Sequence, residues 1–196
     1  MKEVAIIDYG AGNIGSLFNA TEYLNFKPII IKNPTEKNYS HILLPGVGSF
    51  GRLSNNLKKL SLDQYIFECL KSGSYLFGIC IGMQLLFEKS EESPDSKGLS
   101  LINGNFEKIL PQNKSNLPLP HIGFSRVNNE NSKLFNVIEK DPFFYFIHSY
   151  CLKSVPKNVN FCNTEYGEKF ISFVEKDNIF GSQFHPEKSH KTGLKL

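Results

Sequence analysis

Three side chains that lie far apart in the sequence could together carry out nucleophilic catalysis. The first, Cys80, belongs to the stretch Gly78-Ile-Cys80-Ile-Gly82, which directly follows an apolar run. This pattern is typical of a nucleophile elbow, in which a strand turns sharply into a helix and exposes one side chain. Glycines are expected on both sides because a Cβ would clash in so tight a turn. The backbone N–H groups at the helix start would favour a thiolate.

A base and its orienting carboxylate occur near the other end of the chain, in Gln183-Phe-His185-Pro-Glu187. His185 could take the proton of the Cys80 thiol, and Glu187 could hold the imidazole in the required tautomer. Residues i and i+2 of an extended segment project to the same side, which suits this pair. An isolated cysteine between glycines is as readily a small core residue. The three residues together favour a catalytic triad.

Alternating strands and helices would bring these residues together. Apolar runs predict buried strands at 4–7, 28–31, 42–44 and 76–79, and helical spacing predicts helices from about residue 13, at 62–71 and at 83–88. Aromatic-rich segments predict further strands at 105–110, 143–147, 160–162, 170–173 and 179–184. The expected fold is a three-layer α/β fold with a mostly parallel central sheet and an antiparallel extension. Cys80 would then lie beyond the carboxyl ends of the strands, where such sheets bind ligands.

Composition favours one globular domain, residues 1–196. The chain carries a net charge of +3 and 40% hydrophobic residues, enough for a substantial core. No apolar run reaches membrane length and the start is unlike a signal peptide, so we expect a cytoplasmic protein without membrane contact. Dispersed lysines argue against nucleic-acid binding, and four scattered cysteines predict neither disulfides nor a metal site. The proline-rich stretch 111–120 is expected to be a surface loop.

Two glycine-rich loops follow predicted strands. Gly10-Ala-Gly12-Asn-Ile-Gly15 matches the dinucleotide-binding fingerprint, but the acidic residue that should follow about 20 positions later is absent. We therefore expect a tight strand-to-helix turn and no cofactor. The loop Gly46-Val47-Gly48 could instead help to form an oxyanion hole, which needs two N–H donors. The N–H of Ile81 would be the first donor, and that of Val47 or Gly48 the second.

Together these motifs resemble those of the class I, triad-type glutamine amidotransferases. Within that family, five segments are similar to the glutaminase subunits of imidazole glycerol phosphate synthases: 8–13, 44–50, 120–123, 146–150 and 183–189. The resemblance extends over residues 4–196. It implies a flavodoxin-like fold, no cofactor and no metal, and it implies that Cys80 attacks the side-chain amide of glutamine. His185 would protonate the departing ammonia and later activate water.

The resemblance also implies substrate and partner contacts. Gln84, Ser149 and Tyr150 match positions that contact the amino-acid end of glutamine. Five residues are at positions of the face that docks a barrel-shaped cyclase subunit in a heterodimer: Asn13, His121, Phe124, Tyr145 and Lys188. The cyclase would use the ammonia to form imidazole glycerol phosphate and AICAR in histidine biosynthesis.

Phe124 departs from the family, which usually has tryptophan there, so a second partner has to be considered. Similar subunits supply ammonia to synthases that amidate surface sugars. A free-standing cysteine peptidase or γ-glutamyl hydrolase is a further alternative, but it would need no docking face. A non-catalytic binding subunit would need no triad.

Overall fold

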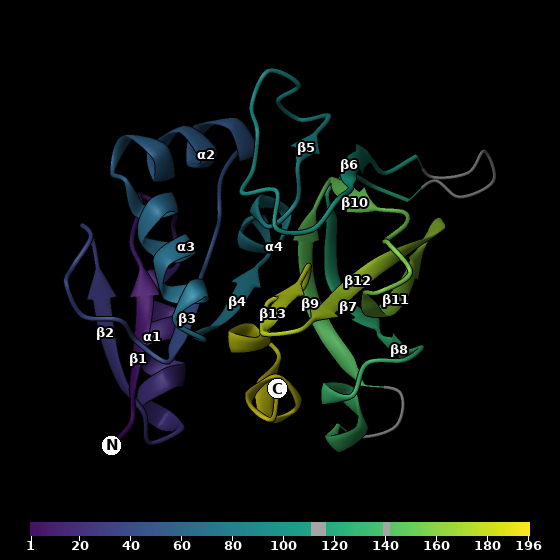
Figure 1. The fold of residues 1–196 in the computed structure, drawn as a ribbon. Helices are drawn as coiled ribbons and strands as arrows, with labels where there is room; N and C mark the ends of the chain where they lie inside the picture. The colour runs from purple at the N-terminus through teal and green to yellow at the C-terminus, as the bar shows by residue number, and fades with distance from the viewer. Residues whose placement is uncertain (111–116, 139–141) are drawn as a thin grey trace.

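The computed structural model describes residues 1–110, 117–138 and 142–196, and its central feature is one large mixed sheet (Figure 1). Five neighbouring strands are parallel: β2 (Lys27–Ile31), β1 (Glu3–Ile7), β3 (His41–Leu44), β4 (Tyr75–Ile79) and β13 (Ile179–Ser182). The sheet continues through β12 (Glu168–Lys176), β10 (Tyr150–Leu152) and β6 (Asn105–Lys108), each antiparallel to its predecessor, and ends at the short β5 (Lys89–Ser90). Parallel strands end at one edge, so this arrangement gathers the loops that follow them.

Helices cover both faces of the parallel strands. The crossover from β1 to β2 contains α1 (Ile14–Tyr23), and the crossover from β3 to β4 contains α2 (Phe50–Lys59) and α3 (Leu62–Lys71). The two crossovers run in opposite directions along the sheet. Because such connections are right-handed, α1 lies on one face and α2 and α3 on the other. Short helices complete the chain: α4 (Ile81–Leu85), α5 (His190–Leu194), and the 3₁₀ segments η1 (Leu134–Val137) and η2 (Pro186–Lys188).

A second sheet lies beside the antiparallel half. It consists of β7 (His121–Arg126) and β9 (Phe143–His148). Two further strands belong to the large sheet: β11 (Asn160–Tyr166) pairs with β12 and with the short β8 (Asn128–Asn129). The space between the sheets is filled mainly by phenylalanine, and the buried rings are Phe135, Phe144, Phe146, Phe170, Phe173 and Phe184. A separate apolar core joins the parallel strands to the helices. The abundance of phenylalanine therefore reflects packing between two layers of sheet.

The sequence predictions agree with this fold in class and differ in detail. The helix α2 was not expected, although Phe50, Leu53 and Leu57 have helical spacing and are buried. The helix predicted at 83–88 begins at Ile81 and ends at Leu85. The strands β5, β7, β8 and β10 were also missed, because β5, β8 and β10 have only two or three residues and β7 lacks a clear apolar pattern. Most of the predicted loop 111–120 lies outside the described residues. None of the helices in the described part of the chain has the length and hydrophobicity needed to cross a lipid bilayer.

Candidate active site

Cys80 lies on a sharp turn between β4 and α4, as the glycine pattern predicts. Its backbone has φ 56° and ψ −110°, a conformation that non-glycine residues rarely adopt. A Cβ on Gly78 would lie 2.6 Å from the backbone of Gly82, and a Cβ on Gly82 would lie 1.8 Å from the carbonyl oxygen of Leu44. The backbone N–H of Cys80 also donates to the carbonyl of Ser182, at 2.7 Å, on the neighbouring β13. The turn is therefore held in a strained form by close backbone packing.

The Cys80 side chain faces a cavity of about 240 Å³. Its Sγ atom lies 3.8 Å from the carbonyl oxygen of Ile147 and 3.7 Å from the amide nitrogen of Gln183. The first can accept from a thiol and the second can donate to a thiolate. Six residues that were predicted to form the oxyanion hole or to contact substrate line the same cavity: Val47, Gly48, Ile81, Gln84, Ser149 and Tyr150. The structure thus gathers these positions around one sulfur atom.

His185 and Glu187 form the expected base–carboxylate pair. The His185 Nδ1 atom lies 2.7 Å from Glu187 Oε1, and both side chains are at most 2% exposed. The backbone of His185 is fixed by its N–H bond to the Tyr145 carbonyl, at 2.9 Å, and by the Ser189 hydroxyl, which donates to the His185 carbonyl at 2.6 Å. The Nε2 atom has no hydrogen-bond partner among the described residues. The imidazole therefore keeps one nitrogen available for proton transfer at the Cys80 side.

Asn13 contributes a second hydrogen bond to the triad carboxylate. Its side-chain amide donates to Glu187 Oε1 at 2.5 Å, from a left-handed backbone conformation with φ 74° just before α1. The amide of Asn13 is thereby engaged inside this chain, although the resemblance predicted it only for the partner face. Its neighbour Gly12 donates its N–H to the carbonyl of Val47, at 3.3 Å. Glu187 thus has its orientation set by two donors from opposite ends of the sequence.

The electrostatic surroundings make His185 a cation at neutral pH. Burial alone lowers its pKa, but the nearby Cys80 sulfur and then the Glu187 carboxylate outweigh this effect and raise the pKa to about 10. An imidazolium beside the sulfur stabilises the thiolate, which is the nucleophilic form of cysteine. The same imidazolium is the acid that a departing amine requires.

Glu187→Gln is expected to make the enzyme lose activity at a lower pH on the alkaline side of its pH–activity profile. The amide would keep the hydrogen-bonding shape but remove the negative charge, so the pKa of His185 would fall. Activity that needs protonated His185 is lost as pH rises through that pKa, so the alkaline limb of kcat/KM should move to lower pH. We expect kcat/KM near neutrality to fall roughly 100-fold. Glu165→Gln, on an exposed residue of β11, is the control. An unmoved alkaline limb would show that Glu187 does not tune His185.

The predicted oxyanion donor is already engaged. The N–H of Ile81 donates to the carbonyl of Gly46, at 3.3 Å. Gly46 can approach this closely because it has no side chain: a Cβ there would lie 2.7 Å from the Ile81 side chain. Val47 and Gly48 line the cavity beside it. In this conformation the first predicted donor is therefore not free to stabilise an oxyanion.

One acidic residue in the cavity was missed by sequence reasoning. Glu92 is the only carboxylate among the residues that line the cavity beside Cys80, and its Oε2 atom accepts the N–H of Phe50 at 2.6 Å, at the start of α2. Gln84, also in the cavity, donates to Gln183 at 3.3 Å and leaves its Oε1 atom without a partner among described residues. Both residues therefore line the same cavity. No local motif marks Glu92, because it reaches the cavity only through the fold.

The residues predicted for the partner interface separate into two groups. Phe124 is 46% exposed, its ring stacks on His190 with centroids 5.4 Å apart, and it meets Tyr145 edge-on at 5.6 Å. The Lys188 ammonium lies 5.9 Å from the centre of the Tyr145 ring. These four side chains form an aromatic cluster on the surface. His121, by contrast, is 1% exposed, so its side chain does not reach a surface where a partner could touch it.

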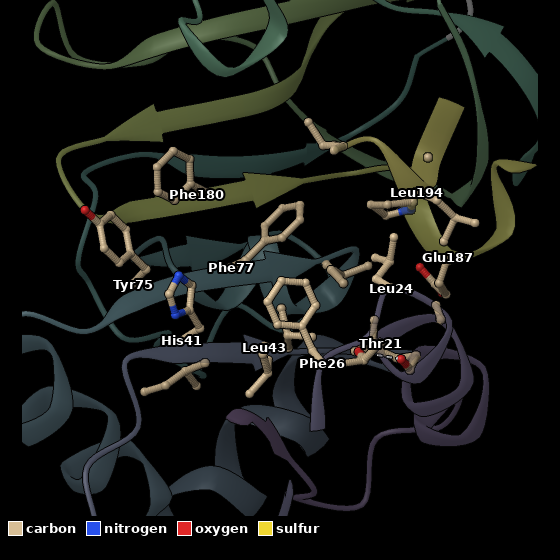
Figure 2. A pocket seen from close by; sticks show the side chains of 18 of the residues that line it. Thr21, Leu24, Phe26, His41, Leu43, Tyr75, Phe77, Phe180, Glu187 and Leu194 are labelled. Atoms are coloured by element: carbon tan, nitrogen blue, oxygen red, sulfur yellow. Dashed lines mark hydrogen bonds between the residues drawn. The ribbon is translucent and has the colours of Figure 1, made fainter. Parts of the chain in front are cut away.

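A second, larger cavity of about 400 Å³ has Glu187 of the triad among its lining residues (Figure 2). It is lined mostly by apolar side chains, including Phe26, Leu43, Phe77 and Phe180, with Glu187 at one end. No cysteine or serine is among its lining residues, so we place the chemistry at Cys80. Within the described ranges, no three His, Cys, Asp or Glu side chains gather as a metal site would require. The other three cysteines are buried, and burial raises the pKa of Cys151 to about 12.

Comparison with known proteins identifies the family. A model described as "Glutamine amidotransferase class-I" matches residues 5–195, and the chain belongs to this family. It is 43% identical to the imidazole glycerol phosphate synthase subunit HisH of Helicobacter hepaticus, covering 98% of this chain and 94% of that protein. It is 40% identical to the HisH subunit of Oceanobacillus iheyensis, covering 98% and 95%. A solved structure described as a glutamine amidotransferase shares the fold, with a TM-score of 0.76 at 15% identity over 97% and 94% of the two chains.

Proposed function

We propose that this chain is the glutaminase subunit of an imidazole glycerol phosphate synthase in histidine biosynthesis. It hydrolyses glutamine to glutamate and ammonia and passes the ammonia to a synthase subunit. The observation that carries the proposal is the Cys80 nucleophile beside the His185–Glu187 pair, in a chain about 40% identical to named HisH subunits over nearly its whole length.

The reaction proceeds through a thioester. The Cys80 sulfur attacks the side-chain amide carbon of glutamine, and the carbonyl oxygen becomes an oxyanion. When this intermediate collapses, the carbon–nitrogen bond breaks and the nitrogen leaves as ammonia with a proton from His185. Water then attacks the thioester, and neutral His185 takes its proton. Collapse of this second intermediate breaks the carbon–sulfur bond and restores the Cys80 thiolate beside protonated His185, and the new carboxyl group of glutamate loses its proton to solvent.

Efficient turnover requires a change at the oxyanion loop. The Ile81 N–H must leave the Gly46 carbonyl and point at the substrate oxygen. The existing bond is long, at 3.3 Å, so rotation of the loop carbonyl breaks only a weak contact. We expect the isolated chain to hydrolyse glutamine slowly, and partner binding at the neighbouring surface to accelerate it.

Glu92 supplies the charge that recognises the amino group of glutamine. Replacement by glutamine keeps an oxygen for the Phe50 N–H but removes the negative charge. We expect Glu92→Gln to raise KM for glutamine about 10- to 100-fold with a smaller change in kcat, since hydrogen bonds to charged groups contribute about 1.5–3 kcal/mol. The measurement is glutamate release against glutamine concentration. Glu91→Gln is the control, because Glu91 instead accepts the N–H of Lys108 at 2.8 Å.

A substrate without the amino group tests whether Glu92 recognises that group. 4-Carbamoylbutanoate has the side-chain amide and the carboxylate of glutamine but lacks the amino group. The Glu92→Gln variant and the unmodified chain should therefore hydrolyse it with similar kcat/KM. Equal KM values of the two proteins for glutamine itself would remove Glu92 from the substrate site.

The ammonia acceptor is a barrel-shaped cyclase subunit that docks on the aromatic cluster of Phe124, Tyr145, Lys188 and His190. Exposed aromatic rings and a cation over a ring are typical of residues that dominate binding energy at interfaces. The cluster adjoins His185, because the backbone N–H of His185 donates a hydrogen bond to the carbonyl of Tyr145. Ammonia released at Cys80 therefore has a short route to a partner bound there.

The full proposal is tested by reconstitution. The purified chain is mixed with a histidine-pathway cyclase, the nucleotide substrate of that cyclase and glutamine, and imidazole glycerol phosphate and AICAR are measured. We expect both products to form. They should still form when ammonium salts replace glutamine, but not when the cyclase is removed. Glutamate release without product would favour a surface-sugar synthase as partner. Release of glutamate from γ-glutamyl peptides without any partner would favour a γ-glutamyl hydrolase.

A further inference from the structure

Two buried histidines outside the triad lie next to the glutamine cavity. His121 on β7 and His148 at the end of β9 face each other across the second sheet, with His121 Nδ1 3.0 Å from His148 Nε2. Their side chains are almost entirely enclosed. His148 lines the cavity that holds Cys80, yet the reaction described above does not use either ring.

The hydrogen bonds of this pair have only one consistent direction. His148 Nδ1 lies 2.8 Å from the carbonyl oxygen of Tyr150, which can only accept, so Nδ1 carries a proton and donates. In the neutral ring the Nε2 atom of His148 is then an acceptor, and it receives the Nδ1–H of His121. The Nε2 atom of His121 accepts in turn from the Ser125 hydroxyl, at 2.8 Å. Both rings therefore carry their proton on Nδ1.

The surroundings keep both rings neutral and in place. His121 is stacked between Tyr166, with centroids 3.9 Å apart, and Phe146, with centroids 4.9 Å apart. Burial lowers the pKa of His121 to about 4. Burial likewise lowers the pKa of His148 to about 3, with a smaller lowering from the charges of His121 and His185. A proton added to His148 would go to Nε2 and point two N–H groups at each other across the His121–His148 contact. A proton added to His121 would go to Nε2 and remove the acceptor of the Ser125 hydroxyl.

We propose that the chain of bonds from Ser125 through His121 and His148 to Tyr150 positions the wall of the glutamine cavity. His121 and His148 are positioning residues in this proposal, which rests on the proposed glutaminase function. The wall segment, residues 147–150, touches the nucleophile through the Ile147 carbonyl and is anchored behind by the Ile109 N–H, which donates to the Ser149 carbonyl at 2.9 Å. The His148 bond to Tyr150 fixes the corner between these two anchors, where Ser149 and Tyr150 face the cavity.

The first test reads the tautomers directly and needs no activity. The chain has five histidines, and ¹⁵N-labelled imidazoles can be assigned with His121→Asn and His148→Asn variants. At neutral pH we expect both rings to be neutral with the proton on Nδ1, whereas the free side chain prefers Nε2. An Nε2 proton or an imidazolium at either position would overturn the proposal.

The second test separates positioning from structural support. His121→Phe keeps an aromatic ring between Tyr166 and Phe146 but removes the donor, while His121→Asn places an amide donor near the position of Nδ1. With partner at saturation, we expect the phenylalanine variant to raise KM for glutamine about tenfold, with a smaller change in kcat, because one buried hydrogen bond is lost. The asparagine variant should stay within about threefold of the unmodified chain. An unchanged KM in the phenylalanine variant, or equal KM values in both variants, would overturn the proposal.

Alkylation of Cys80 by iodoacetamide provides the control for this test. Iodoacetamide reacts with the sulfur without occupying the amino-acid end of the cavity, so its rate should be the same in all three proteins. A diazo-ketone analogue of glutamine does occupy that end, and it should react more slowly with His121→Phe. If His121→Phe reacted with neither iodoacetamide nor the diazo-ketone, its active site would be damaged, and the assignment of His121 as a positioning residue would be overturned. Absence of glutamate release in the unmodified chain would count against the glutaminase function, while the tautomer test would still decide the hydrogen-bond chain.

Discussion

Cys80→Ala is expected to reduce glutamine hydrolysis by at least about 10,000-fold. The thioester cannot form without the sulfur, and no other side chain in the cavity is a comparable nucleophile. Folding should survive, since the substitution only shortens a small side chain on a turn that is held by backbone contacts. Glutamate release in the presence of saturating partner is the measurement.

Two comparisons make this expectation specific. Cys69→Ala changes another buried cysteine, on α3, whose sulfur contacts Asn38 and not the cavity. That variant should keep its glutaminase activity. The complex that contains Cys80→Ala should still make imidazole glycerol phosphate when ammonium salts replace glutamine. Glutamate release at the normal rate by the Cys80 variant would show that the nucleophile lies elsewhere.

Gly82→Ala is expected to destabilise the fold by more than about 3 kcal/mol, which is at the upper end of effects for single substitutions. The new Cβ would lie 1.8 Å from the carbonyl oxygen of Leu44 and 2.8 Å from its carbonyl carbon. Both are backbone atoms of a buried strand, so neither can move aside without disturbing the sheet. The free energy of unfolding, measured by denaturant titration, gives the result.

Gly15→Ala is the matched control for this prediction. Gly15 lies in the first turn of α1, and a Cβ there would meet no atom within 4 Å. Alanine favours helix over glycine by about 1 kcal/mol, so this variant should be neutral or slightly more stable. Equal stabilities of the two variants would mean that the turn around Cys80 is looser than its contacts indicate.

The local parts of the fold and site could be predicted from the sequence, because their signals are local. The strand leading to Cys80 is an apolar run, the strand leading to His185 begins with Ile179 and Phe180, and the glycines around Cys80 indicate the close packing of its turn. Helix α2 was missed, because Gly51 and Ser54 interrupt its apolar pattern. Both are buried there, where small side chains permit close packing.

The long-range parts of the site depend on contacts that no local pattern encodes. Glu92 follows a two-residue strand and reaches the cavity only because it also accepts the N–H at the start of α2. His121 belongs to a motif that resembles a docking segment, yet its ring is turned inward between Tyr166 and Phe146. The side of a strand that faces inward is set by the sheet packed against it.

Two adjacent residues before α1 contact two parts of the active site, the oxyanion loop and the triad carboxylate. Gly12 holds the Val47 carbonyl in the oxyanion loop, and Asn13 holds the carboxylate that orients His185. A displacement of this short segment therefore cannot alter the acid–base pair without also altering the support of the oxyanion loop. A molecule that binds here and moves the segment would switch both functions together, so the enzyme would have a single on–off control in place of two independent adjustments.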